Sequence, residues 1–568
     1  MGSVFPWNNR GVSDMENPDT SKKIFLSPAH LPTMLLIIGY PVYWLELYGM
    51  KRGDGTTSLL APLLFLLSAV YVLGRHGRAV CSLAATFKDF IASKQSGVRF
   101  FLGTGCVLSA LILLCVWRAA LLPPHLIQEF DALHYHYTLP RQHLLMGSFQ
   151  HILWAADDLF LLPLDFALAP YWFATPLANK FPQFIFLLGM ISVSLSLGRQ
   201  FSQERFIRPA LILFAILGSH HIGIQMGTAM LDLVIAYLFL AALDSLFKGN
   251  YGLFLVEFTF FFWAKSFIPL QMTSLLVLFF VLLKFQSLFG WNSAQWGFDQ
   301  SIPVQIQWAD FKPFRKVGIG FLLLSIFIAG PFLIKSLYYA GTPLFPFAPG
   351  VLVVNKDMDL DSRHWQSMLD SSQTFMSEVK NGYGHGRSFW AFMKHFWLIA
   401  VPESGVNNRF DYPVGLVYLL ILGPFVYRLL DSWRKKELAV LPFFVVLYWL
   451  SWWFGSQQSR FLYIPILLMM ILVISSMRET TKVFVSVLLL ALLLNALSLA
   501  RSHQQDWGRP AASTLRPRDR ELIEMSREYI KSNRKDVIEL DFHDVVFAQF
   551  PVKVTRESLP HTLALPEE

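Results

Sequence analysis

One polar segment, residues 123–149, gathers side chains that can move protons and bind anions. It reads PPHLIQEFDALHYHYTLPRQHLLMGSF and carries Asp131, His134, Tyr135, His136 and Arg141 in close succession. A carboxylate beside imidazoles and a guanidinium suits general acid–base chemistry. His134 and His136 point apart on a helix, so the sequence does not predict a metal site built from both. The alternative is an ordinary polar loop with interfacial tyrosine and histidine side chains.

Two cations lie beside apolar runs in other parts of the chain. Lys265 stands in FFFWAKSF, at the end of one run, and Arg460 stands at the start of a later one. Cations at such boundaries can bind a phosphate group through charge-assisted hydrogen bonds. The alternative for both is that the long side chain extends to the membrane surface without binding a substrate.

Further carboxylates are Asp157 and Asp158, adjacent in WAADDLF, and Asp232 within an apolar run. A pair of carboxylates can bind a divalent cation, so the sequence leaves a metal open, although it requires no cofactor. We favour the other interpretation, in which the pair forms the polar face of a helix lying on the membrane surface. Asp232 either lines a cavity or marks a shorter apolar run.

The elements that must position these residues are membrane helices. Of the 568 residues, 54% are hydrophobic and only 15% are charged. The apolar runs approach the roughly 20 residues that a helix needs to cross about 30 Å of hydrocarbon. They predict an all-α, polytopic transmembrane bundle of about thirteen helices, beginning at Leu31–Tyr48 and ending near residues 483–499.

Basic residues orient this bundle. They cluster in loops around Arg75, Arg199, Lys312 and Arg434, which fall on one side when the spans are counted and are therefore expected to be cytoplasmic. The net charge of +8 follows from these loops, and no basic stripe interleaved with aromatics indicates nucleic-acid binding. Three cysteines predict no disulfide framework.

The predicted organisation has three parts. Residues 1–30 form a cytoplasmic N-terminal segment, and residues 31–500 form the transmembrane domain with external loops at 123–182 and 336–412. Residues 501–568 form a small extramembrane C-terminal domain, with one helix near 517–532 followed by a β-prone stretch.

Three segments resemble motifs of one enzyme family. DALHYHYTLP, followed by Gly147, resembles the D-x-x-x-Y-H…P…G signature of bacterial GT-C glycosyltransferases, which are relatives of protein O-mannosyltransferases and of the aminoarabinose transferase of lipid A. YAGTPLFPF, residues 339–347, is similar to their G-N-P-x-x-P-F loop, with Thr342 where asparagine is usual. QQSRFLYIP, residues 457–465, is similar to their Q-x-R-Y-x-x-P stretch, with Phe461 in place of tyrosine. The motifs stand in the order found in the family.

The resemblance implies a GT-C-like fold and a sugar donor linked to polyprenyl phosphate. It further implies an acceptor hydroxyl on a glycan, lipid or protein, inversion at the anomeric carbon, and Asp131 as the general base. By the same analogy, the enzyme lies in a bacterial inner membrane and its site faces the periplasm. The candidates for binding the donor phosphate are Arg460, Lys265 and Arg141. Further candidates for the substrate site are His134, Tyr135, His136 and Asp158.

Three other functions compete with this one. A multi-pass transporter or lipid flippase would explain the many spans and Asp232, although the chain lacks halves of similar hydropathy. An O-antigen ligase or polymerase would carry a late external loop rich in arginine, whereas residues 336–412 contain only Arg363, Arg387 and Arg409. A scaffold without activity is the remaining alternative.

Overall fold

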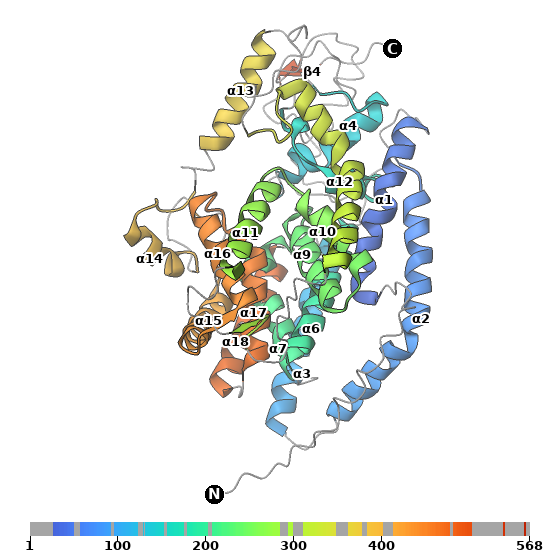
Figure 1. Ribbon diagram of the computed structural model, residues 1–568. Helices are drawn as coiled ribbons and strands as arrows, with labels where there is room; N and C mark the ends of the chain where they lie inside the picture. Colours follow the sequence, from blue (N-terminus) through green and yellow to red (C-terminus); the bar gives the residue numbers. More distant parts are fainter. Residues whose placement is uncertain are drawn as a thin grey trace, which may run out of the picture.

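The computed structural model describes residues 27–49, 57–91, 96–122, 129, 131–152, 156–174, 179–202, 207–284, 293–298, 311–347, 362–377, 383–400, 410, 413–477, 481–502, 538–539 and 562–563. This part of the chain is mostly helical (Figure 1). The first nine α-helices are α1 (Leu31–Tyr48), α2 (Leu60–Ile91), α3 (Ser96–Ala120), α4 (Thr138–Met146), α5 (Pro163–Trp172), α6 (Phe181–Phe201), α7 (Ile207–Gly218), α8 (His220–Gln225) and α9 (Asp232–Phe247). The next nine are α10 (Tyr251–Phe262), α11 (Phe267–Lys284), α12 (Phe311–Ala340), α13 (Ser362–Ser377), α14 (Phe389–Leu398), α15 (Leu416–Arg434), α16 (Val440–Phe454), α17 (Tyr463–Ser476) and α18 (Lys482–Ser502).

Six helices of the described chain are long and apolar enough to cross a membrane, as expected for an integral membrane protein. A seventh span is formed if α10 and α11, which meet at a bend of 120°, are counted as one broken span. The prediction of about thirteen spans is not confirmed. Several predicted runs form shorter helices, such as Ile207–Gly218, and 12 residues reach only about 18 Å at 1.5 Å per residue.

The bundle is built around α17. Every residue of this helix is buried, and it packs against α6, α7, α9, α15 and α16. A helix that is apolar on all sides is expected in such a central position. By contrast, α12 exposes large apolar side chains, including Leu322, Leu323 and Phe327, which suits a surface against lipid.

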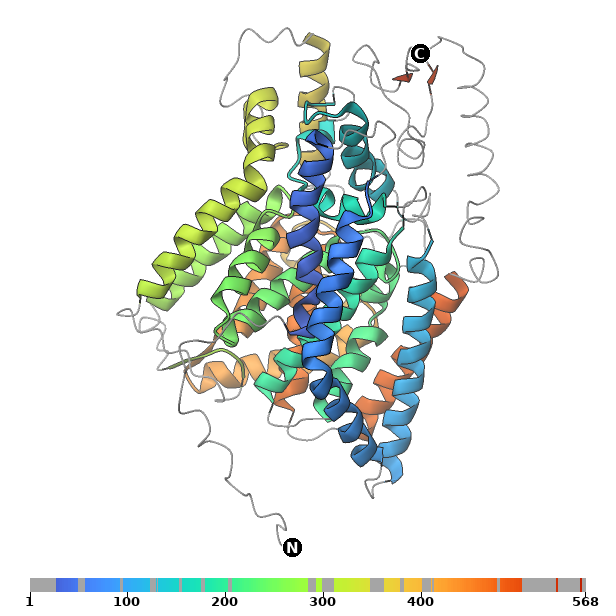
Figure 2. The same cartoon turned by 90° about the vertical axis from the view of Figure 1, so that its right-hand side faces the viewer.

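Other helices pair around this centre. Two distant parts of the chain, α3 and α18, lie side by side (Figure 2), and α18 also packs on α7. α1 packs against α5, a short helix whose residues are all buried, and α6 and α10 flank α9. Short parallel strands β1 (Ser293–Gln295) and β2 (Glu437–Ala439) join two connecting segments.

The two predicted external loops contain ordered helices. Residues 123–182 include a π-helical turn η3 (Ala132–His136), α4, a 3-10 turn η4 (Ala156–Leu159) and α5. α12 continues to Ala340, past the predicted start of the second loop at residue 336. Most of residues 1–30 and of the C-terminal segment lie outside the described residues, apart from a turn at Pro28–His30 and the antiparallel strands β3 (Ile538–Glu539) and β4 (Thr562–Leu563).

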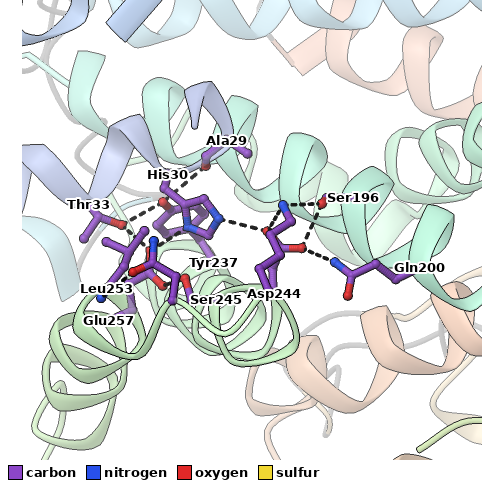
Figure 3. Close-up of polar contacts among 12 residues, drawn as sticks. Ala29, His30, Thr33, Ser196, Gln200, Tyr237, Asp244, Ser245, Leu253 and Glu257 are labelled. Atoms are coloured by element: carbon purple, nitrogen blue, oxygen red, sulfur yellow. Dashed lines mark hydrogen bonds and ion pairs between the residues drawn. The ribbon is translucent and has the colours of Figure 1, made fainter. Parts of the chain in front are cut away.

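A buried ionic cluster fixes the start of α1 to α9 and α10 (Figure 3). The His30 imidazole contacts Glu257 Oε1 at 2.7 Å through Nδ1 and Asp244 Oδ2 at 2.9 Å through Nε2. Lys248 Nζ also donates to Asp244 at 2.7 Å, so the two carboxylates face two cationic groups. Buried charges are tolerated when they are paired and hydrogen-bonded in this way, and the cluster joins elements more than 200 residues apart.

Candidate functional site

A cavity of about 990 Å³ lies where the three motif segments meet. Its charged and polar wall comes from Asp131, Tyr135, His136, Asp157, Lys265, Ser266, Gln271, Asp370, Thr374, Tyr383, Ser451, Ser456, Gln458 and Arg460. Its apolar wall comes from Phe160, Leu161, Leu162, Phe267, Leu270, Pro346, Phe347, Phe375, Trp452 and Phe461, with Gly455 between them. This mixture suits an amphipathic ligand with a charged group and an apolar chain.

The first motif enters the wall through the π-helical turn η3. Its defining hydrogen bond runs from Tyr137 N to Ala132 O over 2.9 Å, five residues back. This wider turn allows Asp131, Tyr135 and His136 to reach the same cavity. Turns of this kind occur frequently at functional sites, because they redirect side chains that a regular helix would separate.

Asp131 and Arg460 form an ion pair between the first and third motifs. Arg460 Nη1 donates to Asp131 Oδ2 at 2.5 Å, and Arg460 Nε donates to Gln458 Oε1 at 2.9 Å. Burial on its own raises the pKa of Asp131, but the guanidinium outweighs it and holds that pKa below its ordinary value. The carboxylate is therefore ionised and a weak base at neutral pH.

Lys265 lies in the break between α10 and α11, beside the first turn of α11. Its ammonium donates to Asp232 Oδ1 at 2.9 Å, and Gln225 Nε2 donates to the other oxygen at 3.0 Å. The Phe461 ring lies near both cations, 5.7 Å from Lys265 Nζ and 5.5 Å from Arg460 Cζ. Two cations, each paired with a carboxylate, thus line the cavity beside Ser266 and Phe267 at the start of α11.

The second motif follows α12 and closes another side of the cavity. Gly341 adopts φ +64°, a conformation that glycine takes without strain, and the chain then turns so that Pro346 and Phe347 line the wall. Ser336 Oγ holds the turn by donating to Thr342 O at 2.7 Å. Ser372 of α13 donates to Pro346 O at 2.6 Å, which fixes α13 beside this turn.

Behind the cavity wall, His136 is paired with Asp165 of α5. His136 Nδ1 and Asp165 Oδ1 are 2.5 Å apart, and each side chain is 1% exposed. His136 Nε2 is buried and makes no hydrogen bond with any described residue. Burial raises the pKa of Asp165, although the His136 imidazole opposes the shift.

Asp158 is not part of the cavity wall, contrary to its assignment as a substrate-site candidate. It is buried in a separate cluster, where it accepts hydrogen bonds from Lys335 Nζ at 2.8 Å, from the backbone N–H of Ile152 at 2.7 Å, and from the side chains of His143 and His151. Burial alone raises the pKa of Asp158, but Lys335 and His143 outweigh it and hold that pKa well below its usual range. Only its neighbour Asp157 reaches the cavity.

Two other predicted residues do not join the described site. Arg141 does not line the cavity, because it lies on α4 with 3% exposure and its guanidinium packs 5.3 Å from the centre of the Phe173 ring. The side chain of His134 lies outside the described residues, so its assignment stays a prediction. Among the residues that the structure describes, no cluster of three or more His, Cys, Asp or Glu could hold a metal ion.

Sequence reasoning missed Asp165 and Lys335 and left the role of Asp232 undecided. The signal was an ionisable residue within an apolar segment, which is costly unless the residue is paired and therefore indicates a partner. This signal did not identify the partners, because they are distant in the sequence. The separation is 29 residues for His136–Asp165, 192 for His143–Lys335 and 33 for Asp232–Lys265.

Comparisons of the whole chain with known protein families, with curated proteins and with solved structures find no match.

Proposed function

We propose that this protein is a glycosyltransferase that moves a sugar from a polyprenyl-phosphate donor to an acceptor hydroxyl, with inversion, at the external face of a bacterial inner membrane. The observation that carries the proposal is the convergence of three motifs on one cavity. Asp131 from the first, Phe347 from the second and Arg460 from the third all line its wall. These segments resemble GT-C motifs and are separated by up to about 330 residues of chain.

The cations supply what the leaving group needs. A phosphate departing from the anomeric carbon gains negative charge, and preorganised donors stabilise that charge in the transition state. Lys265 uses one hydrogen bond for Asp232, whereas an ammonium has three donors. Together with Arg460 and the start of α11, it forms the proposed binding site for the donor phosphate.

The apolar wall suits the lipid part of such a donor. Phe267, Leu270 and Phe461 lie beside the two cations, so an isoprenoid chain can leave the phosphate site along apolar side chains. Leu270 lines the cavity and is 43% exposed. We propose that the donor reaches the cavity laterally past this residue.

Asp131 is placed to contact the acceptor. Because Arg460 holds Oδ2, the acceptor hydroxyl would approach the other oxygen, Oδ1. The assignment of Asp131 as general base comes from the family resemblance. The ion pair with Arg460 lowers its basicity.

A lipid transporter is the second candidate, because α10 and α11 form a broken helix pair with a lysine at the break. Discontinuous helices of this kind surround substrate sites in secondary transporters. A transporter would move its lipid without cleaving it, whereas the proposed enzyme breaks the bond between sugar and phosphate.

The test is sugar release or transfer from a panel of radiolabelled polyprenyl-phosphate sugars by the purified protein. We expect one donor to react, and Asp131→Asn to reduce the rate by about 100-fold or more. Asp370→Asn is the matched control, since it removes a carboxylate from the same cavity on α13 and should retain most of the rate. Intact donors with every sugar, or equal rates for wild type and Asp131→Asn, would contradict the proposal.

A further inference from the structure

The pair His136–Asp165 has the geometry of a catalytic base, and the inference drawn from it rests on the proposed function. His136 lines the cavity, and its Nδ1 lies 2.5 Å from Asp165 Oδ1. An ionised Asp165 fixes the tautomer: Nδ1–H donates to the carboxylate, and the lone pair is on Nε2. A histidine held by a carboxylate in this manner is the arrangement in which an imidazole serves as a general base.

His136 and Asp131 reach the cavity from the same turn of the chain. They are five residues apart, and the hydrogen bond of the π-helical turn spans the same number of residues. Both line the cavity, and the positive field of a charged His136 would lower the pKa of Asp131. An acceptor hydroxyl at Asp131 Oδ1 therefore occupies the cavity that the His136 side chain also lines.

His136 Nε2 lacks the partner that a purely structural histidine would have. It is buried and makes no hydrogen bond with a described residue. The desolvation free energy of this nitrogen is offset only if a substrate group or a water molecule binds it. His143 of the Asp158 cluster differs, because it uses both ring nitrogens, one with Asp158 and one with Ser148 O.

The two candidate bases, Asp131 and His136, differ in the charge of the group that each contacts. Arg460 stabilises the ionised form of Asp131, so this carboxylate takes up a proton only in acid. Asp165 stabilises the protonated imidazole of His136 that forms during the reaction. The charged groups that act on Asp131 or Asp165 include Lys265 and Arg460.

We propose that His136 Nε2 takes the proton of the acceptor hydroxyl, while Asp131 orients that hydroxyl and holds Arg460. As the oxygen–hydrogen bond of the acceptor breaks, its oxygen forms a bond to the anomeric carbon. The bond from that carbon to the phosphate oxygen breaks, and its electron pair leaves with the polyprenyl phosphate. Arg460 and Lys265 bind the charge that develops there. The proton on Nε2 then passes to the released phosphate or to water, which restores the neutral imidazole. Asp165 acts through His136 and is a positioning residue.

The experiment measures transfer of the reactive sugar by wild type, His136→Gln, Asp165→Asn and the control His385→Gln between pH 5 and 8. For wild type we expect the rate to fall as the pH is lowered, because an imidazole that already carries a proton on Nε2 cannot take the acceptor proton. His136→Gln should lose about 100-fold and no longer show this fall. Asp165→Asn should lose less, and its pH profile should shift to a different midpoint. The rate of His385→Gln should change by less than about twofold, since its loop position lies outside the cavity wall.

Rescue separates a chemical role from a folding role. His136→Ala removes the ring and leaves room for added imidazole, which should restore the rate at least about tenfold. If His136→Gln keeps its rate and pH profile while Asp131→Asn loses activity, the inference is overturned and the proposed function stands. Loss of activity in His136→Ala without rescue, together with an unchanged pH profile in Asp165→Asn, would also overturn it. If wild type cleaves no donor, the proposed function fails and the inference fails with it.

Discussion

The buried pair Asp158–Lys335 allows the sharpest prediction about stability. Asp158 accepts four hydrogen bonds, and the two side chains are 1% and 3% exposed. Asp158→Asn preserves the shape of the side chain and removes its charge. The ammonium of Lys335 then stays buried without a counter-ion. Breaking a buried pair from one side costs about 3–5 kcal/mol, so we expect a loss of that size in the free energy of unfolding.

The second variant follows from the same geometry. Lys335→Met leaves Asp158 with hydrogen bonds from His143, His151 and the N–H of Ile152. This variant should therefore lose less free energy of unfolding, about 2–3 kcal/mol. The double variant Asp158→Asn/Lys335→Met contains no uncompensated charge. Its total loss should therefore be less than the sum of the two single losses by about 2 kcal/mol.

The assay is equilibrium unfolding in mixed micelles, followed by tryptophan fluorescence. Asp157→Asn is the matched control, because it is the adjacent carboxylate of η4, is less buried and should cost less than about 1 kcal/mol. A loss below about 1 kcal/mol for Asp158→Asn, or strictly additive effects in the double variant, would refute the reasoning.

Three further predictions concern other parts of the molecule. Lys265→Met should weaken binding of a polyprenyl phosphate about 10- to 100-fold in a direct binding assay. The control Lys248→Met changes an exposed lysine of another cluster and should leave the affinity unchanged. Equal affinities of wild type and Lys265→Met would exclude Lys265 from the phosphate site. Burial lowers the pKa of His30, but Asp244 and Glu257 outweigh it and raise that pKa from 6.5 to about 9. This raised pKa adds about 3 kcal/mol to the free energy of unfolding, which is fully present below about pH 6.5 and is lost as the pH rises through 9. The free energy of unfolding of His30→Gln should therefore not show this alkaline loss. Parallel curves of stability against pH for wild type and variant would contradict the prediction. Gly384→Ala should lower the thermal midpoint more than Gly386→Ala does. Both glycines have positive φ, +82° and +92°, so each variant carries a backbone strain of about 1–2 kcal/mol, but only at Gly384 must the Gln457 side chain also move away from the added Cβ. Equal midpoints in the two variants would contradict the contribution of this contact.

The helical fold could be predicted from the apolar runs, but the number of membrane-spanning helices could not be predicted by counting these runs. Length decides whether a run crosses a membrane, and Ile207–Gly218 and Val440–Phe454 are apolar but short. A run that is apolar on all sides, such as Tyr463–Ser476, does not reveal whether it faces lipid or the centre of the bundle. The structure shows that it is the centre.

The candidate site could be predicted in part. The sequence predicts Asp131 from its neighbouring imidazoles and guanidinium and from the family resemblance. It predicts Lys265 and Arg460 from their positions at the ends of apolar runs, and all three residues line the cavity. Asp158 and Arg141 are ionisable residues of the predicted loop 123–182, but they do not line the cavity. Asp158 is buried in an ion pair with Lys335, and Arg141 packs against the Phe173 ring. Their type and spacing do not distinguish a structural charge from a binding one. The pairing of His136 with Asp165 depends on how α5 packs, and no short-range pattern in the sequence contains that information.

The most direct test of the account is the position of the donor phosphate in a cryo-EM structure of the Asp131→Asn variant with a polyprenyl-phosphate sugar bound. We expect phosphate oxygens within about 3 Å of Lys265 Nζ and of the Arg460 guanidinium. We also expect the anomeric carbon to face residue 131 and the lipid chain to leave past Leu270. A phosphate bound more than about 10 Å from both cations would contradict the central claim, because neither could then stabilise the leaving group.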